Sequence, residues 1–377
     1  MSILIAGDFF PGGRLADIAE AEPERLFGRF VQTIRAADLA LLNLETPLCG
    51  PLQPIEKTGP ALSANPAAAA FLVNAGFKLV TLANNHIFDF GSPGLYSTLA
   101  ALDQHGVEYV GAGNSYESAA KPFLLDSNGK KLAIMNFAEN EWSTTRGKVP
   151  GANPLDPVSN YQAIRAASQI VDHVIVVCHG GHEMHDLPSP RMRSLFRFFV
   201  EAGASAVVNH HTHCVSGYEV YQGAPIFYSL GNFLFDNPRM RSGPWTRGMA
   251  VELQIEGGGV DFKIHHFDQC TDVELFSPCD QRTSDIRQQH LDTLNEVISD
   301  DERLERSFEK YSAKQAKRYL RYLEPTRSRL LLAAQNRGLV PSLLSKRQRT
   351  LLLNLIRCEA HRELVIEILE SDVGNPR

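Results

Sequence analysis

The stretch TLANNHIFDFG, from Thr81 to Gly91, ends an apolar run with two asparagines and a histidine, and an aspartate follows closely. A chain that only has to leave a strand needs turn residues such as asparagine and glycine. An imidazole can take up or release a proton near neutral pH, and a carboxylate adds a second reactive group. We therefore expect His86 and Asp89 to take part in chemistry, provided that other parts of the chain supply partners.

Polar side chains of the same kind follow other apolar runs. Asp8 follows the first run in IAGDFFPGG, and Asn43 and Glu45 follow the second in LLNLETPL. The run HVIVVCHGGHE carries His179, and SAVVNHHTH ends in three histidines: His210, His211 and His213. Ligands of open α/β sheets bind at the carboxyl ends of the strands. Together with the stretch around His86, the pattern predicts one site to which five strands contribute.

The residue types at these strand ends indicate a metal site. Carboxylate oxygen and imidazole nitrogen suit a divalent cation such as Mn, Fe or Zn, whereas a thiolate site needs paired cysteines, and the six cysteines form no CxxC pair. One bridging carboxylate with three histidines is enough for two metals, which lower the pKa of a bridging water and clamp a phosphoryl oxygen. His86 is then free to protonate a leaving group or stabilise negative charge.

Each residue also has a purely structural interpretation. Asp8 can cap a turn, Asn84 and Asn85 can be turn residues, and Asp89 can close a loop before a helix. For a single residue this interpretation is the more frequent one. The three histidines at 210–213 favour metal binding, because so many imidazoles in four residues are rarely needed for packing. Glu183 lies in HGGHEMH, which fits a substrate-facing loop and a solvated loop equally well.

The alternation of short apolar runs with helix-like segments predicts a layered α/β domain. Strands are expected at residues 2–6, 39–43, 78–83, 108–110, 132–137, 173–178, 206–208, 226–229 and 249–255. Helices are expected at residues 24–37, 66–75, 93–104, 161–169 and 190–202, and a long loop at 139–157.

The character of the chain changes after about Phe267. The segment CTDVELFSPCDQRTSD reads as a linker, and the rest is helical in pattern, so we expect a domain at 1–268 and a helical, basic region at 269–377. Between Lys314 and Arg349 lie ten basic residues and one acidic residue, Glu324. Such a run is usually a solvated helical face, and the alternative is docking of an acidic partner or polyanion.

Composition excludes several classes of protein. The 377 residues carry a formal net charge of −6, which argues against general nucleic-acid binding. No apolar stretch is long enough to span a membrane, and the amino-terminus has no basic leader followed by a long apolar run. We therefore expect a cytoplasmic protein.

Six ordered segments resemble the bacterial CapA family, which is also called the poly-γ-glutamate or capsule biosynthesis family. They are GDFFPGGR, NLETPL, NNHIFDFG, HGGHE, NHHTH and YSLGNFLFD. That family belongs to the calcineurin-like metallophosphoesterase superfamily. The resemblance covers Ser2 to about Phe267 and implies a layered sandwich of β-sheets flanked by helices. The helical C-terminal extension lies outside it.

The resemblance also implies roles for individual residues. Asp8 and His213 match ligands of a first metal, and Glu45 takes the place of the bridging aspartate. The match for the second metal consists of Asn85, His179 and His211. His86 matches the catalytic imidazole, and Asp89 the aspartate that orients it. Arg14 matches the arginine that closes the family's first motif and is a candidate for contact with an anionic substrate. Apart from the resemblance, Asn84 and Glu183 are further candidates for substrate contact.

The chain departs from the superfamily pattern at several positions. The Asp-x-His start is replaced by Asp8-Phe9-Phe10, so the first metal lacks an imidazole there. Glu45 is longer than the aspartate that it replaces, and Asn209 stands where the last motif has glycine.

Three functions remain open on the sequence. The first is a metal-dependent phosphoesterase-type hydrolase that acts on a phosphorylated or anionic substrate in the biosynthesis of poly-γ-glutamate or a capsular polysaccharide. The second is a non-catalytic accessory protein in polymer assembly or export. The third is amide-bond chemistry on glutamyl substrates at the same metal site. Of these, we favour the enzyme.

Overall fold

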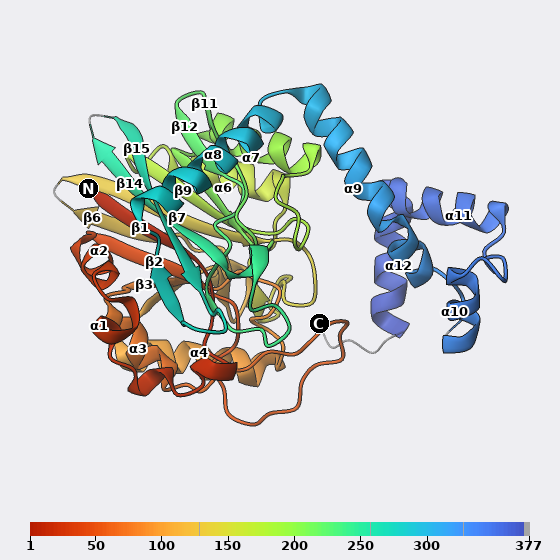
Figure 1. Cartoon of the computed structure of the whole chain (residues 1–377), viewed down its shortest axis with the longest axis horizontal. Helices are drawn as coiled ribbons and strands as arrows, with labels where there is room; N and C mark the ends of the chain where they lie inside the picture. Colours follow the sequence, from red (N-terminus) through yellow and green to blue (C-terminus); the bar gives the residue numbers. More distant parts are fainter. Residues whose placement is uncertain (128, 257, 327, 373–377) are drawn as a thin grey trace. The chain divides into compact units, whose positions relative to one another are not determined.

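The computed structural model describes residues 1–127, 129–256, 258–326 and 328–372 (Figure 1). It divides into two compact units, Met1–Leu304 and a second unit that starts at Glu305. The predicted fold class is confirmed, because the first unit is a layered α/β sandwich of two sheets flanked by helices. The domain boundary predicted at residue 268 stays a prediction.

The first sheet has eight strands in the order β16-β15-β14-β1-β2-β3-β4, and β13 also pairs with β1. The strands that are parallel to one another are β1 (Ser2–Phe10), β2 (Leu39–Leu44), β3 (Leu79–Thr81), β4 (Glu108–Val110) and β13 (Asn232–Phe235). Antiparallel strands extend the sheet: β14 (Arg247–Glu256), β15 (Gly259–Gln269) and β16 (Phe276–Pro278).

The second sheet has six strands in the order β11-β12-β10-β9-β7-β6. Its strands are β6 (Phe123–Ser127), β7 (Lys130–Ala138), β9 (His173–His179), β10 (Ala206–His210), β11 (Tyr218–Tyr221) and β12 (Ala224–Phe227). The four central strands β7, β9, β10 and β12 are parallel to one another. A separate two-stranded pair joins β5 (Ala112–Gly113) to β8 (Gly151–Ala152).

The hydrophobic core lies in two layers, one on each face of the first sheet. Side chains of a strand alternate between its faces, so Ile3 and Ile5 of β1 pack with Val176 of β9 in the core between the sheets. Leu4 and Ala6 point the other way and pack with the helices outside the first sheet. Since both faces are covered, β1 and β2 read as continuous apolar runs rather than as alternating ones.

Helices cover the outer faces of both sheets (Figure 1). On the first sheet they are α1 (Pro23–Phe27), α2 (Phe30–Ala36), α3 (Ala68–Ala75) and α4 (Gly91–His105). On the second sheet they are α6 (Pro157–Ala167) and α7 (Pro190–Ala202), whereas α8 (Gln281–Ile298) packs against β11 of the second sheet and β15 of the first. The short α5 (Tyr116–Ala119) packs on the β5–β8 pair.

Several segments differ from the sequence prediction, and strands β6, β11 and β15 are additions to the predicted set. The helix expected at 24–37 is two helices, because Gly28 between them has a φ of 53°, which ends α1. The segment expected to be a linker after Phe267 instead contributes edge strand β16 and the start of α8. The sequence analysis did not predict strand β13. Its sequence NFLF directly follows the turn Leu230-Gly231 and is too short to indicate a strand.

The chain after α8 is helical, as predicted, with α9 (Asp301–Tyr322), α10 (Arg329–Asn336), α11 (Lys346–Arg357) and α12 (Glu359–Asp372). The basic run lies on α9, α10 and α11 and the segments that join them, and Arg327 of that run lies outside the described residues. Within the described residues, we find no helix with the length and apolar character that a membrane span requires.

Candidate metal centre

The predicted site residues converge at the carboxyl ends of strands from both sheets. Parallel pairing places Asp8 of β1 beside Asn43 of β2. Glu45 comes two residues after Asn43 and therefore lies at the same edge of the sheet. In the second sheet, His179 of β9 pairs with His210 of β10, and the other histidines follow directly. Because the two sheets pack face to face, their polar strand ends meet in one place.

Two groups of donor atoms lie at this meeting point. One consists of Glu45, His179 and His211, and the other of Asp8, Glu45 and His213. Within each group the donor atoms all lie within 4.8 Å of one another, and every residue is buried. Glu45 belongs to both groups, which is the position that a bridging carboxylate must take.

Short contacts tie the two groups together. The Glu45 Oε1 atom lies 3.4 Å from His179 Nε2 and 3.8 Å from His213 Nε2. The Asn85 Oδ1 atom lies 3.0 Å from His179 Nε2, so this amide oxygen adjoins the first of the two groups. On the other side, His213 Nδ1 lies 3.6 Å from Asp8 Oδ2.

Burial controls the charges of these side chains. It raises the pKa of Asp8 to about 8, and the neighbouring Glu45 carboxylate adds to the rise. Burial likewise raises the pKa of Glu45 to about 8 against the opposing effect of His213. Burial lowers the pKa values of His179 and His211 well below their usual range, so both imidazoles are neutral and keep a nitrogen lone pair.

The donor set fits a divalent cation. Both carboxylate oxygens of Glu45 are buried and, among the described residues, neither accepts a hydrogen bond. Leaving such a group without a partner costs free energy, which a cation between the carboxylate and the imidazoles offsets. Oxygen and imidazole donors match Mn, Fe or Zn in chemical type.

The backbone is held in an unusual conformation at the histidine loop. His211 and His213 have φ angles of 89° and 56°, which non-glycine residues rarely adopt. The backbone N–H of His211 donates to Asp8 Oδ2 at 3.1 Å, so this conformation is locked onto the other sheet. Strained residues that persist in a buried cluster of polar groups are typical of functional sites.

Asn232 orients His213, and the sequence interpretation missed this role. Its Nδ2 donates to the carbonyl oxygens of His213 and Trp245 at 3.4 and 3.1 Å. Its Oδ1 therefore faces His213 Nδ1 at 2.8 Å and accepts the proton there. The Nε2 lone pair of His213 is thereby left for the donor group that contains Glu45. The sequence favours a packing role for Asn232, because it follows an apolar strand and a glycine.

His86 lies in a second hydrogen-bonded group beside the metal donors. Its Nδ1 is 2.7 Å from Asp89 Oδ2, as the role of Asp89 requires. The backbone N–H of Leu62 also donates to that oxygen at 2.7 Å, and Lys57 Nζ forms an ion pair with Asp89 Oδ1. The Lys57 side chain is only 4% exposed. Lys57 lies in an irregular segment, so its spacing in the sequence does not point to this contact.

The three predicted substrate contacts have different surroundings. Asn84 is fully buried. Its Nδ2 donates to the Leu44 carbonyl oxygen at 2.8 Å, and its Oδ1 accepts from the backbone N–H of Ile87 at 2.9 Å. Asn84 therefore shapes the turn that presents His86. Glu183 is exposed on the loop after β9; burial raises the pKa values of Glu45 and Glu141, and the charge of Glu183 adds to both rises. Arg14 is paired with Asp236.

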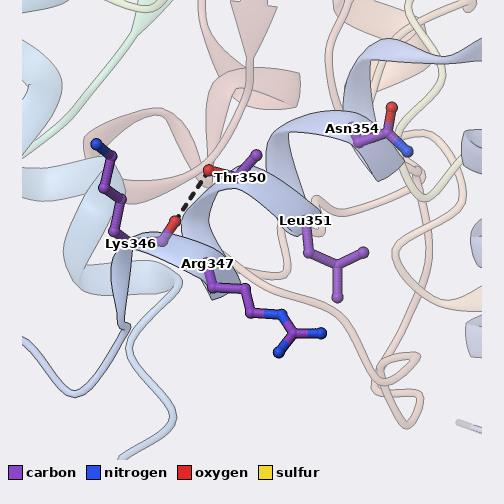
Figure 2. A pocket seen from close by; sticks show the side chains of 5 residues that line it. All are labelled: Lys346, Arg347, Thr350, Leu351 and Asn354. Carbon is purple, nitrogen blue, oxygen red and sulfur yellow. Dashed lines mark hydrogen bonds between the residues drawn. The ribbon is translucent and has the colours of Figure 1, made fainter.

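A shallow hollow of about 760 Å³ lies elsewhere, on α11 in the second unit (Figure 2). Its lining side chains are Lys346, Arg347, Thr350, Leu351 and Asn354. They include no carboxylate, imidazole or thiol, and the Thr350 hydroxyl donates to the Lys346 carbonyl oxygen at 3.0 Å (Figure 2). The hollow therefore offers no metal donor set.

The sequence profile of the bacterial capsule synthesis protein family PGA_cap matches residues 2–237, which include every donor residue described above. The chain belongs to this family. The PGA_cap match ends just after Asp236 and does not reach α8 or the second unit.

Two PGA_cap relatives are similar in sequence. The PGA biosynthesis protein CapA of Bacillus subtilis (strain 168) is 32% identical over 254 residues, which are 66% of this chain and 65% of that protein. The capsule biosynthesis protein CapA of Bacillus anthracis is 33% identical over 192 residues, 49% of this chain and 45% of that protein. The matched part thus spans less than two thirds of each relative's own length.

Among solved structures, a hypothetical protein from Thermus thermophilus aligns with a TM-score of 0.45 and 17% sequence identity. The alignment covers 71% of this chain and 99% of that one.

Proposed function

We propose that this protein is a metal-dependent hydrolase of the metallophosphoesterase type. Its substrate is an anionic molecule in the biosynthesis of a polymer such as poly-γ-glutamate or a capsular polysaccharide. One observation carries the proposal: the buried, unpartnered carboxylate of Glu45 is shared by two sets of metal donors. Membership of the PGA_cap family and the names of the CapA relatives support the class of polymer.

The residues divide into two ligand sets. Asp8 and His213 would hold one cation together with Glu45, and Asn85, His179 and His211 would hold a second one beside the same residue. A divalent cation such as Mn, Fe or Zn at this site would supply an acidified water and would polarise the bond that is attacked. The transfer of the proton to the leaving group is carried out by a side chain of the protein itself.

His86 is the group that handles the proton. Asp89 accepts from its Nδ1, and in the imidazolium form Nε2 carries a second proton that it can donate to the leaving group. Lys57 and the backbone N–H of Leu62 hold the Asp89 carboxylate in place, so the imidazole keeps one orientation.

Amide-bond hydrolysis on a glutamyl substrate is a second candidate. Glu141 accepts from Asn85 Nδ2 at 3.5 Å, and the charge of the exposed Glu183 adds to the rise that burial causes in the pKa of Glu141. Negative charge at this side repels a phosphate dianion and attracts the ammonium group of an amino-acid substrate. An accessory role without catalysis is the third outcome of the experiment below.

The experiment combines metal analysis with a panel of substrates. The purified full-length protein is loaded with Mn, Fe or Zn and assayed on aryl phosphodiesters, phosphomonoesters and γ-glutamyl peptides. We expect one to two metal equivalents and metal-dependent turnover of one class. His211→Ala should lose metal and activity together, whereas His86→Gln should keep its metal and lose about 10²- to 10⁴-fold in kcat.

A matched control is His290→Ala, because His290 is an exposed histidine on α8. It should change neither metal content nor rate. If the metal-loaded protein hydrolyses none of the three classes, the hydrolase proposal is wrong and the accessory role is favoured.

The same proposal includes a cytoplasmic location. All six cysteines are free thiols. A chain that carries free thiols and no disulfide is typical of a reducing compartment.

A further inference from the structure

A cluster of opposite charges lies beside the metal centre and takes no part in the mechanism above. The Asp236 carboxylate is held between two guanidinium groups. Arg14 reaches it through Nε at 3.0 Å and Nη2 at 2.9 Å, both at Oδ1, and through its backbone N–H at 3.2 Å. Arg241 reaches it through Nε and Nη2, each at 3.0 Å, one at each oxygen.

The carboxylate of Asp236 is charged. Burial alone would raise its pKa, but the hydrogen bonds from Arg241 and Arg14 outweigh that effect and hold the pKa below its usual range. Two guanidinium groups and one carboxylate leave the cluster with one net positive charge. Gly13 allows this arrangement, because a Cβ atom at this position would lie 2.8 Å from Asp236 Oδ2.

The cluster has unused hydrogen-bond donors that face solvent. A guanidinium group has five N–H donors; Asp236 accepts from Nε of Arg14 and from Nε and Nη2 of Arg241, and Arg14 Nη2 forms an ion pair with it. Within the described residues, neither Nη1 has a protein acceptor. The Arg14 and Arg241 side chains are 30% and 26% exposed, whereas that of Asp236 is 1% exposed. Asp236 thus fixes two partly exposed guanidinium groups.

The chain connects this cluster directly to the metal centre. In the parallel pair of β1 and β13, Asp8 lies beside Asn232, and both strands then run on to the cluster residues Arg14 and Asp236. Four residues of extended chain from Asn232 to Asp236 span at most about 13 Å. Phe235, next to Asp236, packs on the His213 ring with centroids 5.1 Å apart. The cluster is therefore within reach of a substrate that is bound at the metal centre.

We propose that Arg14 and Arg241, fixed by Asp236, bind a carboxylate group of a substrate whose reacting bond lies at the metal centre. The planar edge of a guanidinium group matches a carboxylate with two parallel hydrogen bonds. The single net charge of the cluster matches a carboxylate rather than a doubly charged phosphate. The assignment rests on the proposed function for the position of the reacting bond.

The test is a binding measurement, which is independent of turnover. Full-length, Zn-loaded protein is titrated by calorimetry with a γ-linked tetraglutamate and with the analogue in which every side carboxylate is an amide. Arg241→Gln should raise the Kd for tetraglutamate about tenfold or more, because a hydrogen bond to a charged group is lost. The Kd for the amide analogue should stay unchanged.

Three controls keep the result interpretable. Arg239→Gln removes the same charge from an exposed arginine on the same loop and should leave both Kd values unchanged. Arg241→Lys keeps the charge but not the planar edge, and it should give an intermediate Kd. Metal content and melting temperature of each variant show that the fold is intact.

Outcomes for the two proposals can be told apart. Arg241-dependent binding without turnover upholds the carboxylate site and overturns the hydrolase. Turnover with equal affinity of the wild type and Arg241→Gln for tetraglutamate overturns the carboxylate site alone. Absence of measurable tetraglutamate binding by the wild type also overturns it.

Discussion

At the scale of single residues, the site depends on side chains that hold the metal donors as much as on the donors themselves. Asn232 fixes the tautomer of His213, and Asp89 fixes that of His86. In each pair at least one residue, His213 or Asp89, lies in a turn or loop. The hydrophobic pattern of the sequence does not predict the conformation of such segments. Groups that orient metal ligands usually contribute a large part of metal affinity.

Asn232→Ala should therefore weaken metal binding about 10- to 100-fold, because His213 loses the acceptor that presents its Nε2 to the donor group. Competition with a chelator of known affinity measures the change. Asn74→Ala, which alters an exposed asparagine on α3, should bind metal as the wild type does. An unchanged affinity in Asn232→Ala would show that the histidine loop positions His213 without this amide.

At the scale of elements, the close approach of β1 to β13 sets the geometry of the site. Gly7 lies where the two strands meet, and a Cβ atom there would lie 2.0 Å from the carbonyl oxygen of Gly231. The next residue, Asp8, donates its backbone N–H to the same oxygen at 3.2 Å. A donor residue of the metal centre thus depends on the absence of a side chain at its neighbour.

Gly7→Ala should force the strands apart and destabilise the fold by about 1–3 kcal/mol or more, as overpacking of a core does. It should also reduce metal affinity, because Asp8 moves with the strand. Chemical denaturation and metal titration measure the two effects. Gly50→Ala is the matched control, since a Cβ at Gly50 meets no atom within 4 Å. Equal stability of the two variants would contradict this account.

At the scale of the whole molecule, the apolar core belongs to the first unit. Both buried clusters end at or before Leu304, and α8 contributes Leu291, Leu294 and Ile298 to one of them. Arg193 of α7 also donates to the Ile298 carbonyl oxygen at 2.6 Å. Helix α8 therefore stabilises the sandwich, although it lies beyond the part of the chain that matches the family.

A chain that ends at Leu304 should fold cooperatively and bind metal with the affinity of the full-length protein, because it keeps both apolar clusters. A chain that ends at residue 268 tests the boundary predicted from the sequence. We expect it to unfold at a lower temperature, since it lacks the apolar contacts of α8. Circular dichroism and metal titration of both chains decide the matter, and equal stability would support the boundary at 268.

The sequence by itself determined the class of fold, the family and the donor types at the strand ends. Apolar runs that end in Asp8, Glu45 or His179 are local patterns, and parallel strands bring their ends to one edge. The single helix expected at 24–37 was wrong, because the positive φ of Gly28 depends on the packing of the turn.

Only the tertiary structure decided which residues share a contact. Asp236 lies 222 residues from Arg14 in the chain, and Lys57 contacts Asp89 from an irregular segment. Neither pair follows a helical or strand period, so no repeat in the sequence marks it. Glu45 was placed as a bridge by resemblance alone, and its place in both donor groups follows from how the two sheets pack against each other.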